Sequence, residues 1–477
     1  MYAATSSVAL VGGDVRPVEV QVHVGRQSDQ FKLSGLPDTA VREAKDRVRA
    51  AVMSSGIKFP NRTVTVNLAP AHLPKSGTDF DLPIALGVLA ASKEIPHPGA
   101  VVVVGELALD GSVRSGATTV GAAVLSARSG QPCLVAASAA GEVAAVPGSR
   151  VHGVSSLAHA VEVLRVGMER HPPVDASSPN EPREPGDLAE VRGQPMARRA
   201  LEVAAAGGHH LLLHGPPGGG KTMLARRLPG ILPGLGDDQA VEVALIYAAA
   251  GLKRGLSRSR PFRSPHHTAS RAALVGGGSG VAVPGEVSLA HRGVLFVDEM
   301  AEFPRANLDT LRQPLEDGTV TVARRGVTAT FPSSFQLVAA TNPCPCGYLG
   351  DRRKPCECRP AMVARYRQRV SGPLLDRFDL VVKVDRLEAS HVDEPEPDPS
   401  DEIRRRVDGA RKRLANGAPE LSAGARGLLS TALGNSLLTA RGFDRVRTVA
   451  TTICALGGGE AVSEEHVAEA MGMRAEW

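Results

Sequence analysis

The sequence predicts an α/β protein in which strands and helices alternate around a glycine-rich loop. The apolar run Leu211–Leu213 leads into that loop at Gly215–Thr222, and a helical run, Met223–Leu228, follows it. Two further apolar runs, Gly293–Val297 and one within 335–344, each end in polar residues. Polar side chains at successive strand ends are typical of the functional edge of a parallel sheet.

The composition is that of an ordinary globular protein, with 43% hydrophobic and 22% charged residues and a net charge of +5 over 477 residues. Aromatic residues reach only 3%, which argues against a surface that holds single-stranded nucleic acid mainly by base stacking. No apolar run reaches the ~18 residues of a membrane span, and the amino terminus does not resemble a secretory signal. Four of the six cysteines lie between Cys344 and Cys358. We therefore expect a cytoplasmic protein with a candidate metal site and no disulfide scaffold.

Two proline-rich stretches divide the chain. Residues 171–186 lack apolar periodicity, and residues 389–402 are acidic and proline-spaced, as solvated linkers are. They separate three expected domains, at 1–170, 187–388 and 403–477, which agrees with a prior of about three domains for this length.

The first domain mixes strands and helices, whereas the third is expected to be wholly helical. Asp38 is a suitable N-cap for the first helix. In the first domain we expect strands over 15–24, 62–68 and 100–104 and helices over 39–53 and 82–91. In the third domain we expect helices over 403–414, 423–433, 440–456 and 463–471.

The motif G-x-x-x-x-G-K-[ST] at 215–222 stands in the strand–loop–helix context that a phosphate cradle requires. Its glycines let backbone N–H groups converge on phosphate oxygens. Lys221 would place a positive charge on the β- and γ-phosphates, and Thr222 would offer its hydroxyl to Mg²⁺. We predict ATP and Mg²⁺ here, held by Gly215, Pro216, Pro217, Gly218, Gly219, Gly220, Lys221 and Thr222.

The next two strand ends supply candidates for hydrolysis. Asp298 follows its strand directly and would lie beside the metal, and Glu299 would polarise the attacking water. Asn342, at the third strand tip, is suited to hold that water near the γ-phosphate. Without the glycine loop, the two acids would be a surface pair and Asn342 a turn residue before a proline. The order of the three strand tips favours the hydrolytic interpretation.

The stretch SGPLLDRFDL at 371–380 completes a set of motifs that resembles an AAA+ ATPase, with a P-loop core and a helical lid. In the branch with LLDRFD-type motifs, the arginine, here Arg377, is implied to reach the neighbouring subunit's nucleotide. Such a finger contributes about 10³–10⁵ in rate. The alternative is a surface arginine paired with adjacent acids. The resemblance also implies that Arg441 is the lid's second-sensor arginine, with Arg447 as the alternative.

More specific runs resemble the magnesium-chelatase-like branch of AAA+ ATPases, at 260–278, 283–299 and 311–320. Others resemble the YifB/ComM family within that branch, at 35–52, 64–92 and 104–114. The resemblance covers nearly the whole chain. It implies a hexameric motor with an α+β amino-terminal domain of Lon-protease-like fold. The best-known member type is a DNA branch-migration helicase used in natural transformation.

The amino-terminal resemblance does not extend to peptidase chemistry. Lon-type enzymes use a serine a few residues after a P-K-x-G run and a lysine after a later glycine-rich strand. Here Asp79 stands where the serine would be, and 113–124 contain no lysine. A carboxylate cannot replace an activated hydroxyl paired with a lysine base, so we expect a non-proteolytic domain.

The cysteine cluster has the spacing C-x-C, nine residues, C-x-C. Four thiolates so close in sequence suit a tetrahedral structural zinc site, although reduced surface thiols and an Fe–S cluster remain alternatives. The candidate ligands are Cys344, Cys346, Cys356 and Cys358. Basic residues around them suit a phosphate backbone or a solvated loop face; they are Arg352, Arg353, Lys354, Arg359, Arg365, Arg367 and Arg369.

Residues 318–331 read as a β-hairpin with a basic tip at Arg324 and Arg325. In this AAA+ branch such a hairpin points into the central pore, where the arginines would contact DNA without reading its sequence. The alternative is an exposed hairpin kept soluble by arginines. We interpret His266 and His267 as part of the family's helix insert and not as metal ligands, because no partner carboxylate is near.

Taken together, these features predict an Mg-ATP-driven ring motor that acts on branched or single-stranded DNA during recombination. Its substrate is the β–γ phosphoanhydride of ATP, and its partners are DNA and further copies of the chain. A protein-remodelling ATPase and a magnesium-chelatase motor subunit are the alternatives.

Overall fold

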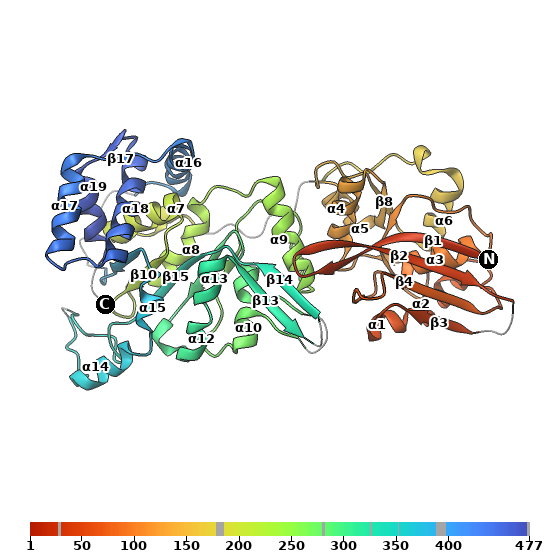
Figure 1. The fold of residues 1–477 in the computed structure, drawn as a ribbon, viewed down its shortest axis with the longest axis horizontal. Coiled ribbons are helices and arrows are strands. Elements are labelled where there is room, and N and C mark those ends of the chain that lie inside the picture. Colours follow the sequence, from red (N-terminus) through yellow and green to blue (C-terminus); the bar gives the residue numbers. More distant parts are fainter. Residues whose placement is uncertain are drawn as a thin grey trace.

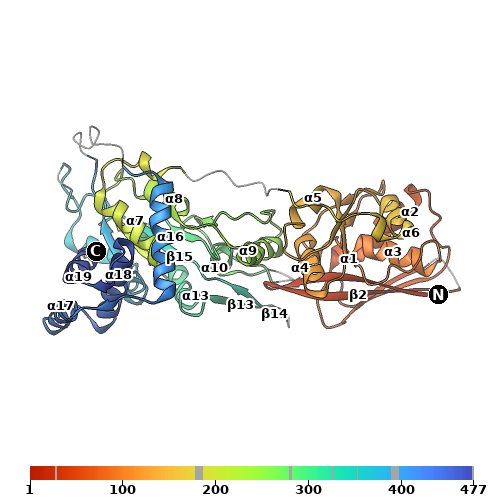
Figure 2. The same ribbon diagram turned by 90° about the horizontal axis from the view of Figure 1, so that it is seen from above.

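The computed structural model describes residues 1–26, 30–177, 186–278, 282–324, 327–351, 353–387 and 397–474. It is an elongated mixed α/β molecule with the amino-terminal unit at one end (Figure 1). Seen from above, the same unit lies beside the remainder of the chain and does not wrap around it (Figure 2). Within the described ranges, no helix is both long enough and apolar enough to span a membrane.

The amino-terminal unit is built on a seven-stranded sheet of order β3-β4-β2-β1-β5-β8-β9. Its strands are β1 (Tyr2–Val11), β2 (Asp14–Val24), β3 (Phe31–Ser34), β4 (Val64–Ala69), β5 (Val102–Val103), β8 (Cys133–Ala136) and β9 (Val151–Val154), with a separate pair, β6 (Glu106–Leu107) and β7 (Val113–Arg114). Its helices are α1 (Thr39–Arg42), α2 (Ala44–Ser54), α3 (Asp81–Ala91), α4 (Thr119–Ser129), α5 (Ala137–Val143) and α6 (Leu157–Val166).

The three strands and the buried helix expected in this unit are confirmed within a few residues. The helix expected over 39–53 is two helices, because the chain turns at Glu43 between α1 and α2. Asp38 caps α1 as predicted, since its Oδ1 accepts from the Val41 amide at 2.8 Å. The long strand β1 was not predicted, although it pairs with β2 along its whole length.

The central unit contains a five-stranded parallel sheet of order β11-β12-β15-β10-β16 and a hairpin, β13–β14. Its strands are β10 (Leu211–His214), β11 (Phe262–Arg263), β12 (Val294–Val297), β13 (Thr319–Arg324), β14 (Val327–Pro332), β15 (Gln336–Thr341) and β16 (Leu380–Lys383). Its helices are α7 (Pro195–Gly207), α8 (Lys221–Ile231), α9 (Asp237–Ala249), α10 (Arg271–Val275), α11 (Glu286–Leu289), α12 (Arg305–Asp309), α13 (Arg312–Asp317), α14 (Pro360–Arg367) and α15 (Gly372–Leu375).

This sheet is buried on both faces, as parallel sheets are. Leu211 and Leu213 of β10 belong to a core shared with α7 and α8, whereas Leu212 faces the opposite core, which contains Phe331 of the hairpin. The nearly continuous apolar runs in the sequence follow from this two-sided burial. The predicted hairpin strands are present, paired antiparallel from Thr319 and Pro332 to Arg324 and Val327.

The carboxyl-terminal helices are α16 (Ser400–Asn416), α17 (Ala423–Gly434), α18 (Ala440–Gly457) and α19 (Glu464–Gly472). All four expected helices are found. The expectation of a wholly helical segment was wrong, because β17 (Glu420–Leu421) and β18 (Ala461–Val462) form a short parallel pair. These helices share one apolar core with α7 and α8, so the third segment packs directly on the second.

The boundaries around the expected acidic linker need one correction. Residues 388–396 lie outside the described part of the chain, but α16 already begins at Ser400, before the expected end at 402. Ser400 is fixed there by Asp187, whose Oδ1 accepts from its amide at 2.9 Å and from its hydroxyl at 3.1 Å. The two residues are 213 positions apart in sequence, so the local composition around the linker cannot predict their contact. Of the linker expected over 171–186, residues 178–185 also lie outside the description.

Among the described residues, the amino-terminal and central units contact each other through α9 and through the β13–β14 hairpin. Val8 and Val15 of the first sheet share an apolar cluster with Ala244 and Leu245 of α9. The turn between β1 and β2 reaches the hairpin, where the Gly13 amide donates to the Thr330 carbonyl at 3.3 Å. The hairpin therefore lies against the amino-terminal unit.

The cap at Asp38 provides a test of the local fold. Asp38→Ala removes the acceptor for the first turn of α1, and we expect a loss of about 1 kcal/mol in unfolding free energy. Asp38→Asn keeps an acceptor and should lose much less. Urea unfolding followed by circular dichroism measures both variants, and equal losses would contradict the capping role.

Candidate functional site

The register of the central sheet brings three distant strand ends to one edge. His214 at the end of β10 pairs with Thr341 at the end of β15, and Val297 of β12 pairs with Ala339 of β15. Because the strands are parallel, the residues that follow them emerge on the same side. The glycine loop, Asp298 and Asn342 therefore meet, as the sequence predicts.

The glycine loop closes tightly over the end of β16. A Cβ atom at Gly215, whose φ is +157°, would lie 2.0 Å from the Val384 carbonyl oxygen, so a side chain cannot be accommodated there. The loop then enters α8 at Lys221, so the amides of the first turn face the cavity.

The cavity beside this loop has a volume of ≈ 440 Å³. That is a suitable size for a nucleotide's phosphates and part of its sugar or base. It is lined by Pro217, Gly218, Gly219, Gly220, Lys221, Thr222, Met223, Asp298, Glu299, Ala340, Thr341 and Asn342.

Lys221 is held at the bottom of the cavity by oxygen atoms. Its Nζ donates to the carbonyls of Gly215 and Pro216, at 2.7 and 2.9 Å, and to Oδ1 of Asn342 at 3.1 Å. Burial lowers the pKa of Lys221 to about 8, and the nearby carboxylates of Asp298 and Glu299 oppose that shift. A polyphosphate would add negative charge beside the buried ammonium and would raise the pKa of Lys221 again.

The other predicted residues also take suitable positions. Thr222 Oγ1 donates to Asp298 Oδ2 at 2.8 Å, which places a hydroxyl and a carboxylate oxygen side by side, as a Mg²⁺ ion requires. Glu299 has a left-handed backbone with φ +50° and a side chain that is 58% exposed. Such a strained conformation is retained where it serves to direct a side chain, here toward the open cavity.

His267 is a neighbour of this site that the sequence did not reveal. Its Nδ1 lies 3.8 Å from Glu299 Oε2, and its ring stacks on His266 at a centroid distance of 4.1 Å. The expectation that no carboxylate is near the two histidines was therefore wrong. They lie in the turn that precedes α10, not in a helix. The 32-residue separation hides the pairing, which depends on β11 and β12 lying side by side.

The two candidate arginines do not line the cavity. Arg377 forms an ion pair with Glu316 of α13, and Arg441 approaches Asp376 at 3.5 Å. The charge of Arg441 is close enough to contribute to a lowered pKa of Arg377, after the larger effect of burial. The two arginines thus lie near each other and outside their own chain's cavity. Arg447 pairs with Asp444 on α18.

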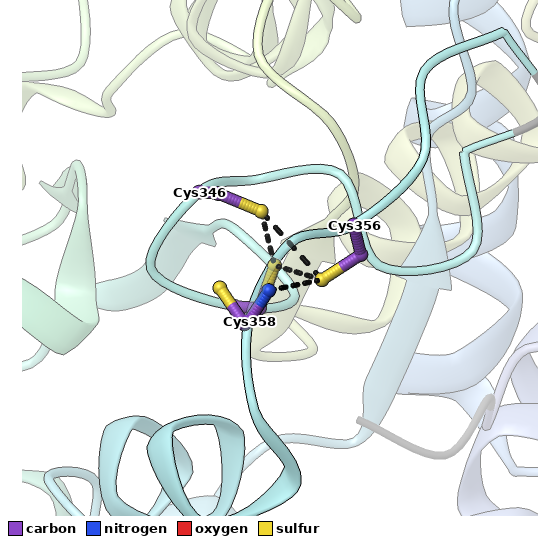
Figure 3. Close-up of side chains that lie close together, drawn as sticks. Cys346, Cys356 and Cys358 are labelled. Atoms are coloured by element: carbon purple, nitrogen blue, oxygen red, sulfur yellow. Dashed lines mark hydrogen bonds between the residues drawn. The ribbon is translucent and has the colours of Figure 1, made fainter.

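The four cysteines of the cluster come together as predicted. Their sulfur atoms all lie within 4.8 Å of one another, and Cys344 is 3.4 Å from Cys346 and 3.7 Å from Cys356. Figure 3 shows Cys346, Cys356 and Cys358 gathered together, with the sulfurs of Cys346 and Cys356 turned toward each other. A tetrahedral Zn²⁺ with Zn–S bonds of about 2.3 Å separates its sulfurs by roughly 3.8 Å. The thiol spacing therefore fits zinc.

The candidate DNA contacts are only partly described. The backbone of Arg324 belongs to β13, while Arg325 and Arg352 lie outside the described residues. Among the basic residues near the cysteines, Arg369 is paired with Glu302 at 2.8 Å, and Lys354 lies over the Tyr348 ring at 4.2 Å.

Asp79 of the amino-terminal unit occupies a closed polar site. Its Oδ2 accepts from both the amide and the hydroxyl of Thr118, each at 2.7 Å. Lys75 is fully buried, and its Nζ donates to the carbonyls of Leu68, at 2.8 Å, and Pro70. Neither group is arranged as a nucleophile and base pair.

Three family models match consecutive parts of the chain. "Subunit ChlI of Mg-chelatase" matches residues 18–139, "Magnesium chelatase, subunit ChlI" matches 187–392, and "Magnesium chelatase, subunit ChlI C-terminal" matches 410–474. The middle model contains every residue that lines the nucleotide cavity.

Similar proteins match the chain over nearly its whole length. An uncharacterised protein of Mycobacterium tuberculosis is 42% identical, with 98% of this chain and 97% of the relative covered. The uncharacterised protein YifB of Escherichia coli is 39% identical, with coverage of 98% and 96%. The competence protein ComM of Haemophilus influenzae is 39% identical, with coverage of 99% and 97%.

The lowered pKa of Lys221 predicts pH-dependent nucleotide binding. Below a pH of about 8 the ammonium is charged in the free protein, whereas above it a proton must be taken up before the phosphates are bound. Affinity for a slowly hydrolysed ATP analogue should fall by up to about tenfold per pH unit above pH 8. Calorimetry in buffers of different ionisation enthalpy measures both affinity and proton uptake. Lys221→Arg, which stays charged, should remove the pH dependence, and a flat wild-type profile would contradict the assignment.

The contact with Glu299 predicts that His267 positions the carboxylate for hydrolysis. His267→Ala should lower kcat by about tenfold and leave the KM for ATP unchanged, because His267 does not line the cavity. His267→Asn retains a donor and should keep more of the activity. Steady-state ATPase kinetics measure this, and a raised KM with normal kcat would show that the contact serves binding instead.

Proposed function

The chain belongs to the YifB/ComM-type magnesium-chelatase-like family of AAA+ ATPases, and from this we propose that it is an ATP-driven ring motor acting on DNA. The supporting observation is the cavity in which Lys221, Thr222, Asp298, Glu299 and Asn342 meet. These groups bind phosphates, hold a divalent cation and activate water, which is the set that phosphoanhydride hydrolysis needs.

Each residue has a distinct part in the proposed hydrolysis. Lys221 and the loop amides bind the β- and γ-phosphates, and Thr222 and Asp298 would hold Mg²⁺, which neutralises phosphate charge. Glu299 accepts a proton from the attacking water, and Asn342 orients that water. The hydrogen bond from Lys221 Nζ to Asn342 Oδ1 supports this role, because it holds the amide beside the lysine that would bind the γ-phosphate.

The positions of the arginines support assembly into a ring. Arg377 and Arg441 lie close together and away from their own cavity. We propose that a neighbouring chain presents both to this nucleotide, in a hexamer, where they stabilise the charge on the γ-phosphate. Arg441 then belongs to the shared interface, although the sequence suggested a sensor over its own nucleotide.

DNA is the proposed partner for two reasons. A close relative over nearly the full length carries the name competence protein. The basic turn of the β13–β14 hairpin would repeat around a ring, giving charge contacts with a phosphate backbone that do not depend on base sequence. The proposed role is branch migration during recombination or natural transformation. The family-model names favour one second candidate, a motor for metal insertion by a magnesium chelatase.

DNA-stimulated hydrolysis distinguishes these roles. Forked DNA at moderate salt should raise the ATPase rate several-fold, and the double variant Arg324→Ala, Arg325→Ala should lose the stimulation but keep the basal rate. The matched control removes two exposed charges on α16, with Arg405→Ala and Lys412→Ala, and should remain stimulated. If DNA leaves the wild-type rate unchanged, the DNA motor is excluded and the chelatase role becomes the better candidate.

A further inference from the structure

The loop that carries the four cysteines lies beside the glycine loop and is linked to it on two sides. It begins two residues after Asn342, because Cys344 continues from the end of β15. Cys344 is fully buried. The amide of Leu349 donates to its sulfur at 3.3 Å, and the Cys358 amide donates to the Cys356 sulfur at 3.4 Å. Amide donors of this kind orient thiolate ligands.

The first contact runs from Gly347 to the glycine loop. Gly347 lies in a turn closed by its amide and the Cys344 carbonyl at 3.0 Å, with φ +83°. A Cβ atom here would lie 2.7 Å from Cδ of Pro217 and 3.9 Å from Cγ of Asn342. The backbone between two cluster cysteines is therefore packed against both the phosphate loop and the proposed water-orienting residue.

The second contact runs through the segment that follows β16. Asp351 forms an ion pair with Arg386 at 3.3 Å, the Arg386 guanidinium lies over the Tyr348 ring at 5.2 Å, and Arg353 donates to the Leu387 carbonyl at 3.4 Å. These links tie residues of the cluster loop to 386–387.

Residues 384–385, in the segment that follows β16, pack against the glycine loop. The Val384 carbonyl oxygen fits against Gly215, and the carbonyls of Val384 and Asp385 lie 3.2 Å from the Cβ position of Gly219. The loop that would hold the phosphates is thus enclosed between Gly347 on one side and 384–385 on the other. Both supports are attached to the cysteine loop.

We propose that a zinc ion bound by the four cysteines positions the phosphate loop and Asn342 for ATP hydrolysis. This inference rests on the proposed ATPase function but not on the proposed DNA partner. With the metal bound, the loop 344–358 is cross-linked and Gly347 and Asp351 are held in place. Without it, only the main chain between Cys346 and Cys356 joins the two C-x-C pairs, and the groups that support Pro217 and Gly219 can shift. The cysteines act through the loop and do not touch the reacting atoms.

Two glycine variants distinguish the effect of the contact between Gly347 and Pro217 from an effect on the fold of the cysteine cluster. Gly347→Ala keeps all four thiols but forces a methyl group against Pro217. Gly350→Ala carries a similar left-handed penalty, at φ +76°, with nothing within 4 Å of the added atom. Both proteins should retain about one zinc per chain. We expect Gly347→Ala alone to weaken nucleotide binding and lower kcat by about 10- to 100-fold.

Reversible zinc removal tests the metal itself. The full-length protein is treated with a zinc-selective chelator in the presence of Mg²⁺ and without DNA, and zinc content, ATPase kinetics and binding of a fluorescent ADP analogue are measured. We expect zinc loss to raise the KM for ATP and lower kcat, with recovery when zinc is added back, while helix content stays constant.

Several outcomes would overturn the proposal. These are wild-type protein without zinc, unchanged kinetics and ADP binding after zinc removal, or Gly347→Ala behaving as Gly350→Ala does. These results differ from the result expected if the proposed ATPase function is wrong. In that case the zinc-loaded wild-type protein would neither bind nor hydrolyse ATP.

Discussion

The parallel register of β15 with its two neighbours, β10 and β12, is the constraint on which the site depends. Pairing His214 with Thr341, and Val297 with Ala339, fixes where the glycine loop, Asp298 and Asn342 leave the sheet. A shift by one residue would reverse which side chains of β10 face each core, burying Leu212 where Leu211 now lies. The two apolar cores therefore specify the register, and the register assembles the chemistry.

That edge of the sheet is open, so segments from elsewhere in the chain must hold its loops. The backbone at 384–385 supports the glycine loop, Gly347 contacts Pro217, and His267 lies beside Glu299. None of these contacts binds phosphate. They hold the glycine loop and Glu299 in place, and small displacements of catalytic groups have large effects on rate. The amino-terminal unit contacts the hairpin at Thr330 and helix α9 through an apolar cluster.

The sequence predicted the features that local chemistry determines. The glycine loop can be predicted because its strand, turn and helix are contiguous in sequence. The capping role of Asp38 can be predicted because a cap lies within one helical turn of its partner. The misses involve long-range pairing. Strand β1 is recognised only by its ladder with β2, and β17 only by its pairing with β18. The neighbours of His267 in sequence do not include its partner, Glu299, which lies in the turn after β12, the strand that pairs with β11.

The ion pair between Arg377 and Glu316 concerns the proposed supply of Arg377 to the nucleotide cavity of a neighbouring chain. The Arg377 side chain is only 15% exposed, whereas Glu316 is 57% exposed. A pair with one solvated partner contributes little to stability, about 1 kcal/mol or less. A neighbouring chain's triphosphate, with several negative charges, would compete effectively for the guanidinium, and Glu316 would return to water at little cost. In the proposed ring, Glu316 would therefore be a partner that Arg377 can leave readily, and the arginine would move to the nucleotide of a second copy.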